Sequence, residues 1–198
     1  GSKDLPVTYK LGAWYNSTTM DSLTTAQNGL PLGDPDADDP VGLKGNFAVY
    51  GVIDRGLYRE ENDPDQGLNG FLRVSVNPQS NRNPITWYFD TGLSYTGLFP
   101  GRPKDILGLG FAWADMSPAL SAQARINNAM NSPVPMPTAE SLIELTYQAP
   151  VRPWLSLQPT MQYIINPGGK TNLIATPTDP SQAIPNALVV GMRAIVSF

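Results

Sequence analysis

Residues 187–198 read ALVVGMRAIVSF and alternate between two kinds of side chain. One face of an extended strand here carries only apolar residues: Leu188, Val190, Met192, Ala194, Val196 and Phe198. The opposite face carries Val189, Gly191, Arg193, Ile195 and Ser197. Because successive side chains of a strand point to opposite faces, this period of two predicts a β-strand with one wholly apolar face. Such a strand needs a partner for its apolar face right up to Phe198, although chain ends are usually polar and frayed.

The same alternation recurs along the rest of the chain and predicts seven further strands. They are expected at residues 5–16, 47–59, 68–77, 85–96, 105–114, 140–149 and 154–165. The segment 47–59 is less regular, because Asp54 and Arg55 are adjacent and can share a face only at a bulge. We expect Tyr50, Asp54 and Tyr58 on its polar face.

The connections between these strands are of two kinds. Residues 17–46, 115–139 and 166–186 form long loops, and PALSAQARINNAMN in the second predicts a short helix. The connections at 60–67, 97–104 and 149–153 are short, as is 77–84, where a longer loop would be expected. Long loops at one end and tight turns at the other are typical of outer-membrane barrels. An even number of strands then places both termini at the end with the tight turns.

Two all-β architectures share this alternation, a soluble sandwich and a transmembrane barrel. The polar faces here carry many Gly, Ser, Thr, Asn and Gln but few charges, whereas a solvated sheet face usually carries more Lys and Glu. The apolar faces bear aromatic residues near strand ends: Tyr15, Trp87, Tyr95, Trp113, Tyr147, Tyr163 and Phe198. This favours an antiparallel transmembrane β-barrel, whose backbone groups must all be paired in lipid. The soluble sandwich remains the alternative.

Composition narrows the functional classes. The chain has 198 residues, a net charge of -4, no Cys and no His, so it lacks the usual ligands of zinc, haem and iron–sulfur sites. No apolar run approaches the roughly 20 residues of a membrane-spanning helix. Basic residues occur singly, which gives no footprint for nucleic acid. We therefore expect membrane lipid or detergent as a partner, no nucleic acid, and no cofactor or metal. Gly1-Ser2 is typical of a cleaved tag, and residues 3–198 are expected to form one domain.

No catalytic group is evident. Glu140 and Glu144 share a strand face at a separation of roughly 13 Å, too far for glycosidase carboxyls, which lie about 5 to 9.5 Å apart. We interpret them as pore-lining carboxylates, although a partner on another strand stays open. The acidic segment 33–40, GDPDADDP, lacks the glycine and glutamate of a calcium loop and is expected to be a solvated loop. The chain is predicted not to be an enzyme.

Several stretches resemble one known family. They are GNFAVYGVIDRGLYRE (45–60), GLNGFLRVSVNPQSNRNPITWYFDTGLSYTGLFPGRPKDILGLGFAWADMS (67–117), ESLIELTYQAPVRPWLSLQPTMQYIINPGG (140–169) and AIPNALVVGMRAIVSF (183–198). The resemblance is to the C-terminal part of carbohydrate-selective porins of the OprB type. It implies an integral barrel in the outer membrane of a Gram-negative bacterium, commonly of about sixteen strands, through which glucose and related sugars diffuse. A terminal Phe is also a pattern by which such barrels are recognised for assembly.

Eight strands are half of such a barrel. The chain is therefore expected to be completed by an N-terminal half or by a second copy, or else to close alone as an eight-stranded barrel with a filled, non-conducting interior.

The inward faces combine charges of both signs with aromatic rings, Phe71 and Trp154 among them. The residues predicted to line the pore and contact sugar are Lys10, Trp14, Asp54, Arg73, Tyr88, Asp90, Glu144 and Arg193. Mixed donors and acceptors suit an uncharged monosaccharide, whereas a ring of one sign would select ions. The alternative is that these charges only neutralise one another across the lumen.

Overall fold

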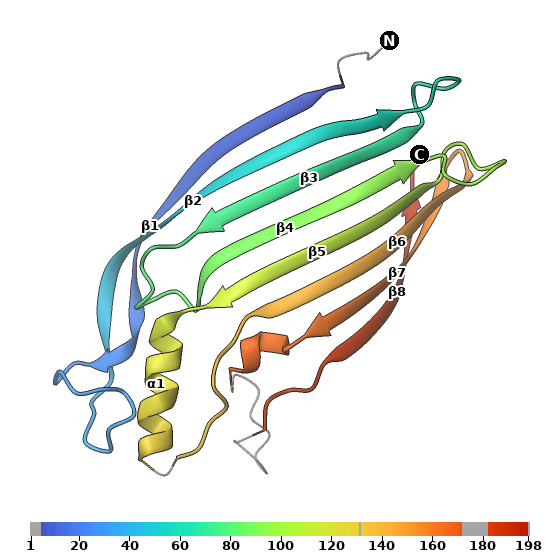
Figure 1. Ribbon diagram of the computed structural model, residues 1–198. Coiled ribbons are helices and arrows are strands. Elements are labelled where there is room, and N and C mark those ends of the chain that lie inside the picture. The colour runs from blue at the N-terminus through green and yellow to red at the C-terminus, as the bar shows by residue number, and fades with distance from the viewer. Residues whose placement is uncertain (1–4, 131, 172–181, 198) are drawn as a thin grey trace.

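The chain forms a single antiparallel sheet of eight strands in sequential order (Figure 1). The computed structural model describes residues 5–130, 132–171 and 182–197. The strands are β1 (Val7–Ala26), β2 (Pro40–Arg59), β3 (Gly67–Val76), β4 (Ile85–Thr96), β5 (Ile106–Met116), β6 (Glu140–Arg152), β7 (Leu155–Ile165) and β8 (Ala187–Val196). A helix, α1 (Pro118–Ala129), follows β5, and a short 3₁₀ helix, η1 (Pro167–Lys170), follows β7. The predicted all-β fold with eight antiparallel strands is confirmed.

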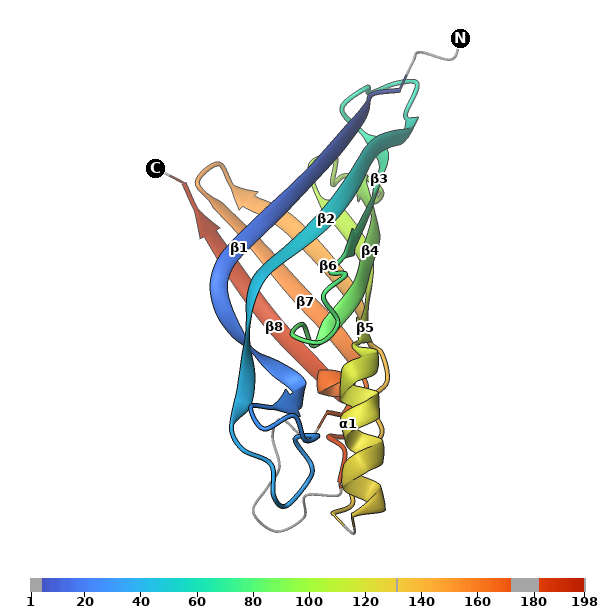
Figure 2. The same cartoon turned by 90° about the vertical axis from the view of Figure 1, so that its left-hand side faces the viewer.

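The sheet curls into an open trough (Figure 2). Each neighbouring pair of strands is hydrogen-bonded, and β1 and β8 form the two free edges of the described sheet. In both views β1 begins and β8 ends at the end of the trough that carries the short turns, whereas α1 lies at the opposite end. This confirms the predicted arrangement of the strand ends. Gly1-Ser2 and Phe198 lie outside the described residues.

The strand register gives the trough a polar face and an apolar face. On the polar face Lys10 is level with Val52, Arg73 and Asp90, and Glu144 is opposite Gln162. On the other face Leu109 lies opposite Leu93 and Leu145. The polar residues that become buried, such as Asp90 and Thr86, lie on the first face, which is the concave one. The predicted division into two faces is confirmed for the seven regular strands.

The apolar residues cover the convex face, and no other part of the described chain packs over them. Leu11 is 85% exposed and Val190 is 73% exposed. The buried hydrophobic residues of the described chain are all alanines: Ala26, Ala48, Ala114 and Ala124. A soluble sandwich would instead bury its large apolar side chains between two sheets. The single sheet therefore contradicts the sandwich alternative, and the convex face needs an apolar medium.

Aromatic residues lie near both ends of the convex face, as predicted. Tyr15, Trp87 and Tyr163 are exposed towards the α1 end. At the short-turn end Tyr58 packs beside Tyr95 at 6.4 Å between ring centroids. Rings that are partly apolar and partly polar suit the boundary between lipid and water.

The turn between β4 and β5 is fixed by one carboxylate. Asp105 accepts a hydrogen bond from Arg102 Nε at 2.6 Å and another from the Tyr147 hydroxyl. The hydrogen bond to Asp105 raises the pKa of the Arg102 guanidinium. Phe99 packs edge-on against Tyr147 at 5.8 Å, so the turn is held by both polar and apolar contacts.

The loop predicted at 17–46 is shorter than expected. Both flanking strands have 20 residues, and the connection between them is 27–39. Register shifts after Asn16 and after Asp21 break the alternation, so the period of two is lost where the strand continues. The prediction was wrong here because Ser and Thr occur on both faces of this part of β1, and such a polar segment without alternation is typical of a loop. The strands extend beyond the level of their neighbours (Figure 1).

Tyr58 does not lie on the polar face, contrary to prediction. The bulge of β2 falls between Gly56 and Tyr58, after Asp54 and Arg55 rather than between them. It moves Tyr58 onto the convex face, opposite Leu68. Asp54 lies level with Thr8 on the concave face, and Arg55 lies level with Val7 on the convex face.

The long loop at 115–139 contains the predicted helix. Ser117 caps α1, because its Oγ accepts from the Ala119 N–H at 3.1 Å, and Pro118 follows directly. Neither α1 nor η1 has the length and apolar character to cross a membrane as a helix. The loop at 166–186 is described only to 171 and from 182.

Residues 77–84 form a short loop that contacts β1, β2 and the start of α1. The buried side chains of Asn83 and Asn46 exchange two hydrogen bonds, at 2.9 and 2.7 Å. Arg82 donates to the carbonyls of Lys44 and Gly45, both at 2.6 Å. The Asn81 carbonyl accepts from the Leu23 N–H at 2.8 Å, so this loop joins β1 to β2. The loop also holds the start of α1, because Ser117 Oγ donates to the Ser80 carbonyl at 2.5 Å.

Asn83→Ala should therefore destabilise this end of the trough. The change removes one member of a buried amide pair and leaves Asn46 Oδ1 without its donor, which costs about 1–3 kcal/mol. The urea midpoint for unfolding from lipid vesicles measures the loss. Asn81→Ala is the control, because Asn81 is exposed and its contact to β1 uses the main chain. Equal midpoints for the two variants would contradict the role of the Asn46–Asn83 pair.

Candidate functional site

The eight predicted pore-lining residues all lie on the concave face. The register places Lys10 and Trp14 of β1 on the same face as Asp54 of β2. Arg73 of β3 lies opposite Asp90 of β4, and Tyr88 lies two residues before Asp90. Glu144 of β6 continues the row of Asp54, and Arg193 of β8 lies opposite Gln158 of β7. One strand pattern therefore brings all eight to the inside of the trough.

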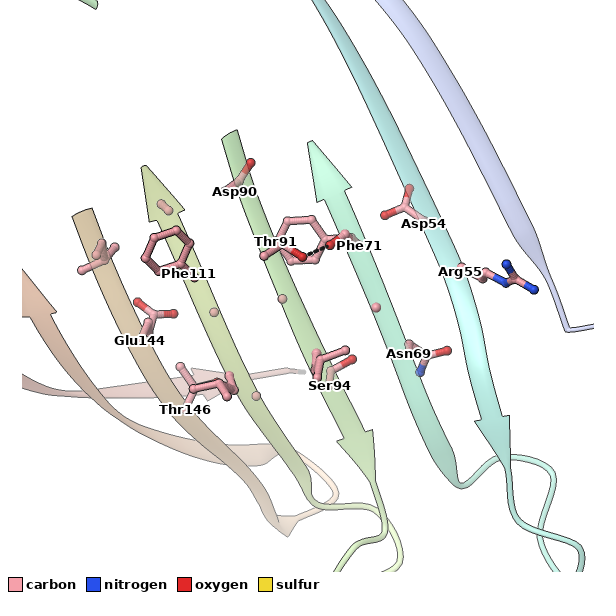
Figure 3. A pocket seen from close by; sticks show the side chains of 18 of the residues that line it. Asp54, Arg55, Asn69, Phe71, Asp90, Thr91, Ser94, Phe111, Glu144 and Thr146 are labelled. Carbon is pink, nitrogen blue, oxygen red and sulfur yellow. Dashed lines mark hydrogen bonds between the residues drawn. The ribbon is translucent and has the colours of Figure 1, made fainter. Parts of the chain in front are cut away.

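A hollow of about 560 Å³ lies over β2 to β6 on this face (Figure 3). Its polar lining comes from Asp54, Asn69, Asp90, Ser94, Glu144 and Thr146, and Phe71 supplies an aromatic ring. Thr91 and Phe111, also drawn in Figure 3, line the hollow as well, although by register they belong to the convex face.

The strongest ionic contact of the site joins Arg73 to Asp90. Arg73 donates from Nε and Nη2 to the two carboxylate oxygens of Asp90, each at 2.7 Å. Its guanidinium also lies 5.6 Å from the centroid of the Tyr88 ring. The Asp90 side chain is only 13% exposed. This bidentate contact fixes the orientation of both side chains, and the cation–π contact with Tyr88 stabilises the guanidinium further.

The other charged residues are held less firmly. Lys10 Nζ contacts Asp54 Oδ2 at 2.8 Å, but the two side chains are 60% and 45% exposed. Glu144 accepts a hydrogen bond from Gln162, on the neighbouring strand. Among the described residues no carboxylate pairs with Arg193. Trp14 lies opposite Ala48 and is 44% exposed.

Within the described chain, the ion pairs of this face join neighbouring strands. The Lys10–Asp54 and Arg73–Asp90 pairs each join adjacent strands of the sheet. Glu144 and Arg193 have no ion-pair partner in the described chain. The face thus presents paired charges of both signs, which give no strong field of a single sign.

Small residues shape the hollow, and sequence reasoning did not single them out as site residues. Gly92 and Gly110 lie in the row of Asp54, Phe71 and Glu144, with Gly108 in the next row. A Cβ built on Gly92 would lie 2.7 Å from the Phe71 ring, so the ring occupies the space above this glycine. The recurrence of glycine on the polar faces of two consecutive strands is the signal that could have indicated this hollow.

Two acidic features of the sequence do not form catalytic or metal sites among the described residues. Glu140 accepts from the Gly168 N–H at 2.5 Å, whereas Glu144 is bound to Gln162. In the segment 33–40, Asp34 Oδ1 accepts from the Asp36 N–H at 2.9 Å. The described chain contains no group of three or more acidic side chains that could hold a metal ion.

A curved antiparallel sheet with an apolar convex face and a polar concave face forms the wall of a membrane-embedded β-barrel of the porin class. The comparison with protein families agrees, because the model of the carbohydrate-selective porin, OprB family, matches residues 1–198. The chain belongs to this family.

Individual relatives match over nearly the whole chain. It is 28% identical over 209 aligned residues to Porin B of Pseudomonas aeruginosa, covering 100% of this chain and 42% of that protein. Among solved structures it is similar to the high-pH structure of Pseudomonas putida OprB, with a TM-score of 0.83 at 27% identity. That match covers 98% of this chain and 45% of the other. The low-pH structure of the same protein matches with a TM-score of 0.50 at 23% identity, which supports the fold alone. The chain thus spans less than half the length of these relatives.

Proposed function

We propose that this chain forms part of the wall of an outer-membrane channel through which small neutral sugars, glucose among them, diffuse passively. The observation that carries the proposal is the hollow on the concave face, where acidic, amide and hydroxyl groups surround an aromatic ring. Sugars offer both hydroxyl groups and apolar ring faces, so such a lining suits them. Membership of a carbohydrate-selective porin family supports the same substrate class.

The arrangement of charges favours a neutral solute over an ion. Lys10 and Arg73 are each compensated by a carboxylate on the adjacent strand. A channel that selects ions by charge instead concentrates one sign in a ring. Binding on this wall must remain weak, because conduction requires release as well as entry. No covalent step is needed.

We propose further that the free edges of β1 and β8 pair with additional strands. An open sheet edge in lipid leaves main-chain N–H and C=O groups unpaired, each at a cost of several kcal/mol. The additional strands are an N-terminal half-barrel or a second copy of this chain. The similarity to 45% of the length of the Pseudomonas putida OprB chain favours the half-barrel.

Crosslinking tests how the edges are completed, and the chain has no native Cys to interfere. Leu11→Cys with Val190→Cys places one thiol on each edge strand of the convex face. A flexible bifunctional thiol reagent should give no link within one chain, because further strands separate the two edges. Leu109→Cys with Leu145→Cys is the positive control, because these residues are direct neighbours. A link between positions 11 and 190 would mean that eight strands close alone, and a dimer band would mean that a second copy completes the barrel.

Sugar flux tests the proposed function itself. The complete barrel that contains this chain is reconstituted into liposomes, and swelling is followed in isotonic glucose, sorbitol and KCl. We expect rapid swelling in glucose and a KCl current in planar bilayers that glucose partly blocks. An inserted barrel that passes KCl but neither admits glucose nor is blocked by it would overturn the proposal.

A further inference from the structure

The concave face contains a gap between Phe71 and Glu144, which we call the Phe71 notch. It consists of Phe71, Gly92, Gly110 and Glu144, on the four consecutive strands β3 to β6. These residues lie in one row of the sheet, and their side chains share the concave face. Phe71 and Glu144 form the two ends of the notch, and the two residues between them in the row, Gly92 and Gly110, have no side chain.

The floor of the notch is bare main chain. The Phe71 ring lies over Gly92, where a Cβ would come within 2.7 Å of it. At Gly110 the nearest side-chain atom is Glu144 Cβ, 3.9 Å from the Cβ position, so this part of the floor is open. Adjacent strands are about 4.8 Å apart, so Phe71 and Glu144 are separated by roughly 14 Å along the row. The ring covers part of this span and leaves the rest free.

Polar groups with unused hydrogen-bonding capacity surround the notch (Figure 3). Glu144 Oε2 accepts a hydrogen bond from Gln162, and Glu144 Oε1 has no hydrogen-bond partner in the described chain. Lys10 Nζ donates to Asp54 Oδ2, so Asp54 Oδ1 remains available to a ligand. Asn69 accepts from Arg59 through Oδ1 and keeps its Nδ2 donors. Ser94 and Thr146 add hydroxyl groups in the next row.

We infer that the Phe71 notch is a binding subsite for a neutral pyranose whose ring stacks on Phe71 while its hydroxyl groups donate to Glu144. The inference rests on the proposed function and adds the residues that would determine its specificity. Phe71 is 39% exposed, so its ring is available to a ligand. An aromatic ring binds the C–H face of a pyranose with equatorial hydroxyl groups, but a linear polyol has no such face. The uncompensated carboxylate of Glu144 disfavours sugar acids.

The test measures block of the KCl current by glucose in planar bilayers, using the complete barrel. Phe71→Leu removes the aromatic face and should raise the half-blocking glucose concentration about three- to tenfold, the range expected for loss of one ring contact. Phe71→Tyr keeps the face and should restore block to within about twofold. Phe89→Leu is the matched control, because Phe89 lies on the convex face and does not line the hollow, and it should leave the block unchanged. Sorbitol block should be the same in all four proteins.

A second variant fills the notch instead of removing its ring. Gly110→Leu has room for its side chain and should abolish glucose block while the KCl current persists. Heat-modifiable migration confirms that each variant is folded. If the unaltered barrel is blocked by glucose but Phe71→Leu and Gly110→Leu are blocked equally well, this subsite is wrong while the channel function stands. If the unaltered barrel shows neither block nor glucose flux, the proposed function itself fails.

Discussion

Val190→Arg should destabilise the barrel by about 2–4 kcal/mol, the cost of a cationic side chain on the lipid face near the bilayer centre. Val190 lies near the middle of β8, between Leu188 and Met192 on the convex face, and is 73% exposed. In water such exposure would make the position tolerant of charge. In lipid the same exposure makes it intolerant. Unfolding of the complete barrel from lipid vesicles by urea measures the change.

The matched control is the preceding residue. Val189 lies opposite Gln162 on the concave face, so Val189→Arg introduces the same side chain into the lumen. It should change stability by less than about 0.5 kcal/mol, as surface substitutions usually do. Equal destabilisation of the two variants, or greater loss for Val189→Arg, would contradict the assignment of the faces.

Asp90→Ala should destabilise the barrel by about 1–3 kcal/mol. Both carboxylate oxygens of Asp90 accept hydrogen bonds from Arg73, and the Asp90 side chain is 13% exposed. Its removal leaves the guanidinium without its partner inside the wall. The full cost of breaking a buried pair is not expected, because Arg73 itself is 48% exposed.

Asp54→Ala is the control for this prediction. Asp54 is also a carboxylate of the concave face paired with a cation on a neighbouring strand, but both partners are well exposed. Exposed pairs contribute roughly 0.2–1 kcal/mol, so this change should cost less than 1 kcal/mol. Urea unfolding of the two variants compares them. A loss for Asp54→Ala as large as that for Asp90→Ala would mean that burial of Asp90 is not what matters.

The fold could be predicted because one physical rule governs most of this chain. A strand between lipid and a polar lumen must alternate strictly, so β3 to β8 were recognisable from the period of two alone. The rule fails where the strands leave the membrane. Beyond Asn16 no lipid selects apolar residues on one face, and bulges shift the register, so the extension of β1 and β2 read as a loop.

The site was predictable only in part. The alternation of side chains along each strand predicts which of them lie on the concave face, so Lys10, Arg73 and Glu144 could all be assigned to it. Which side chains meet across two strands depends on their register, and the sequence pattern of one strand does not determine that register. The Arg73–Asp90 and Lys10–Asp54 pairs therefore could not be predicted. The Phe71 notch depends on glycines of two neighbouring strands falling into one row, and that row exists only once the strands are paired.

Labelling of single cysteines along β8 tests the central claim most directly, that the convex face contacts lipid while the concave face contacts water. Each residue from 188 to 195 is replaced by Cys in the complete barrel, free of other cysteines and embedded in membranes, and treated with a membrane-impermeant thiol reagent. Positions 189, 191, 193 and 195 should react, whereas 188, 190, 192 and 194 should remain unmodified. Uniform labelling, or labelling of the even positions instead, would contradict the account.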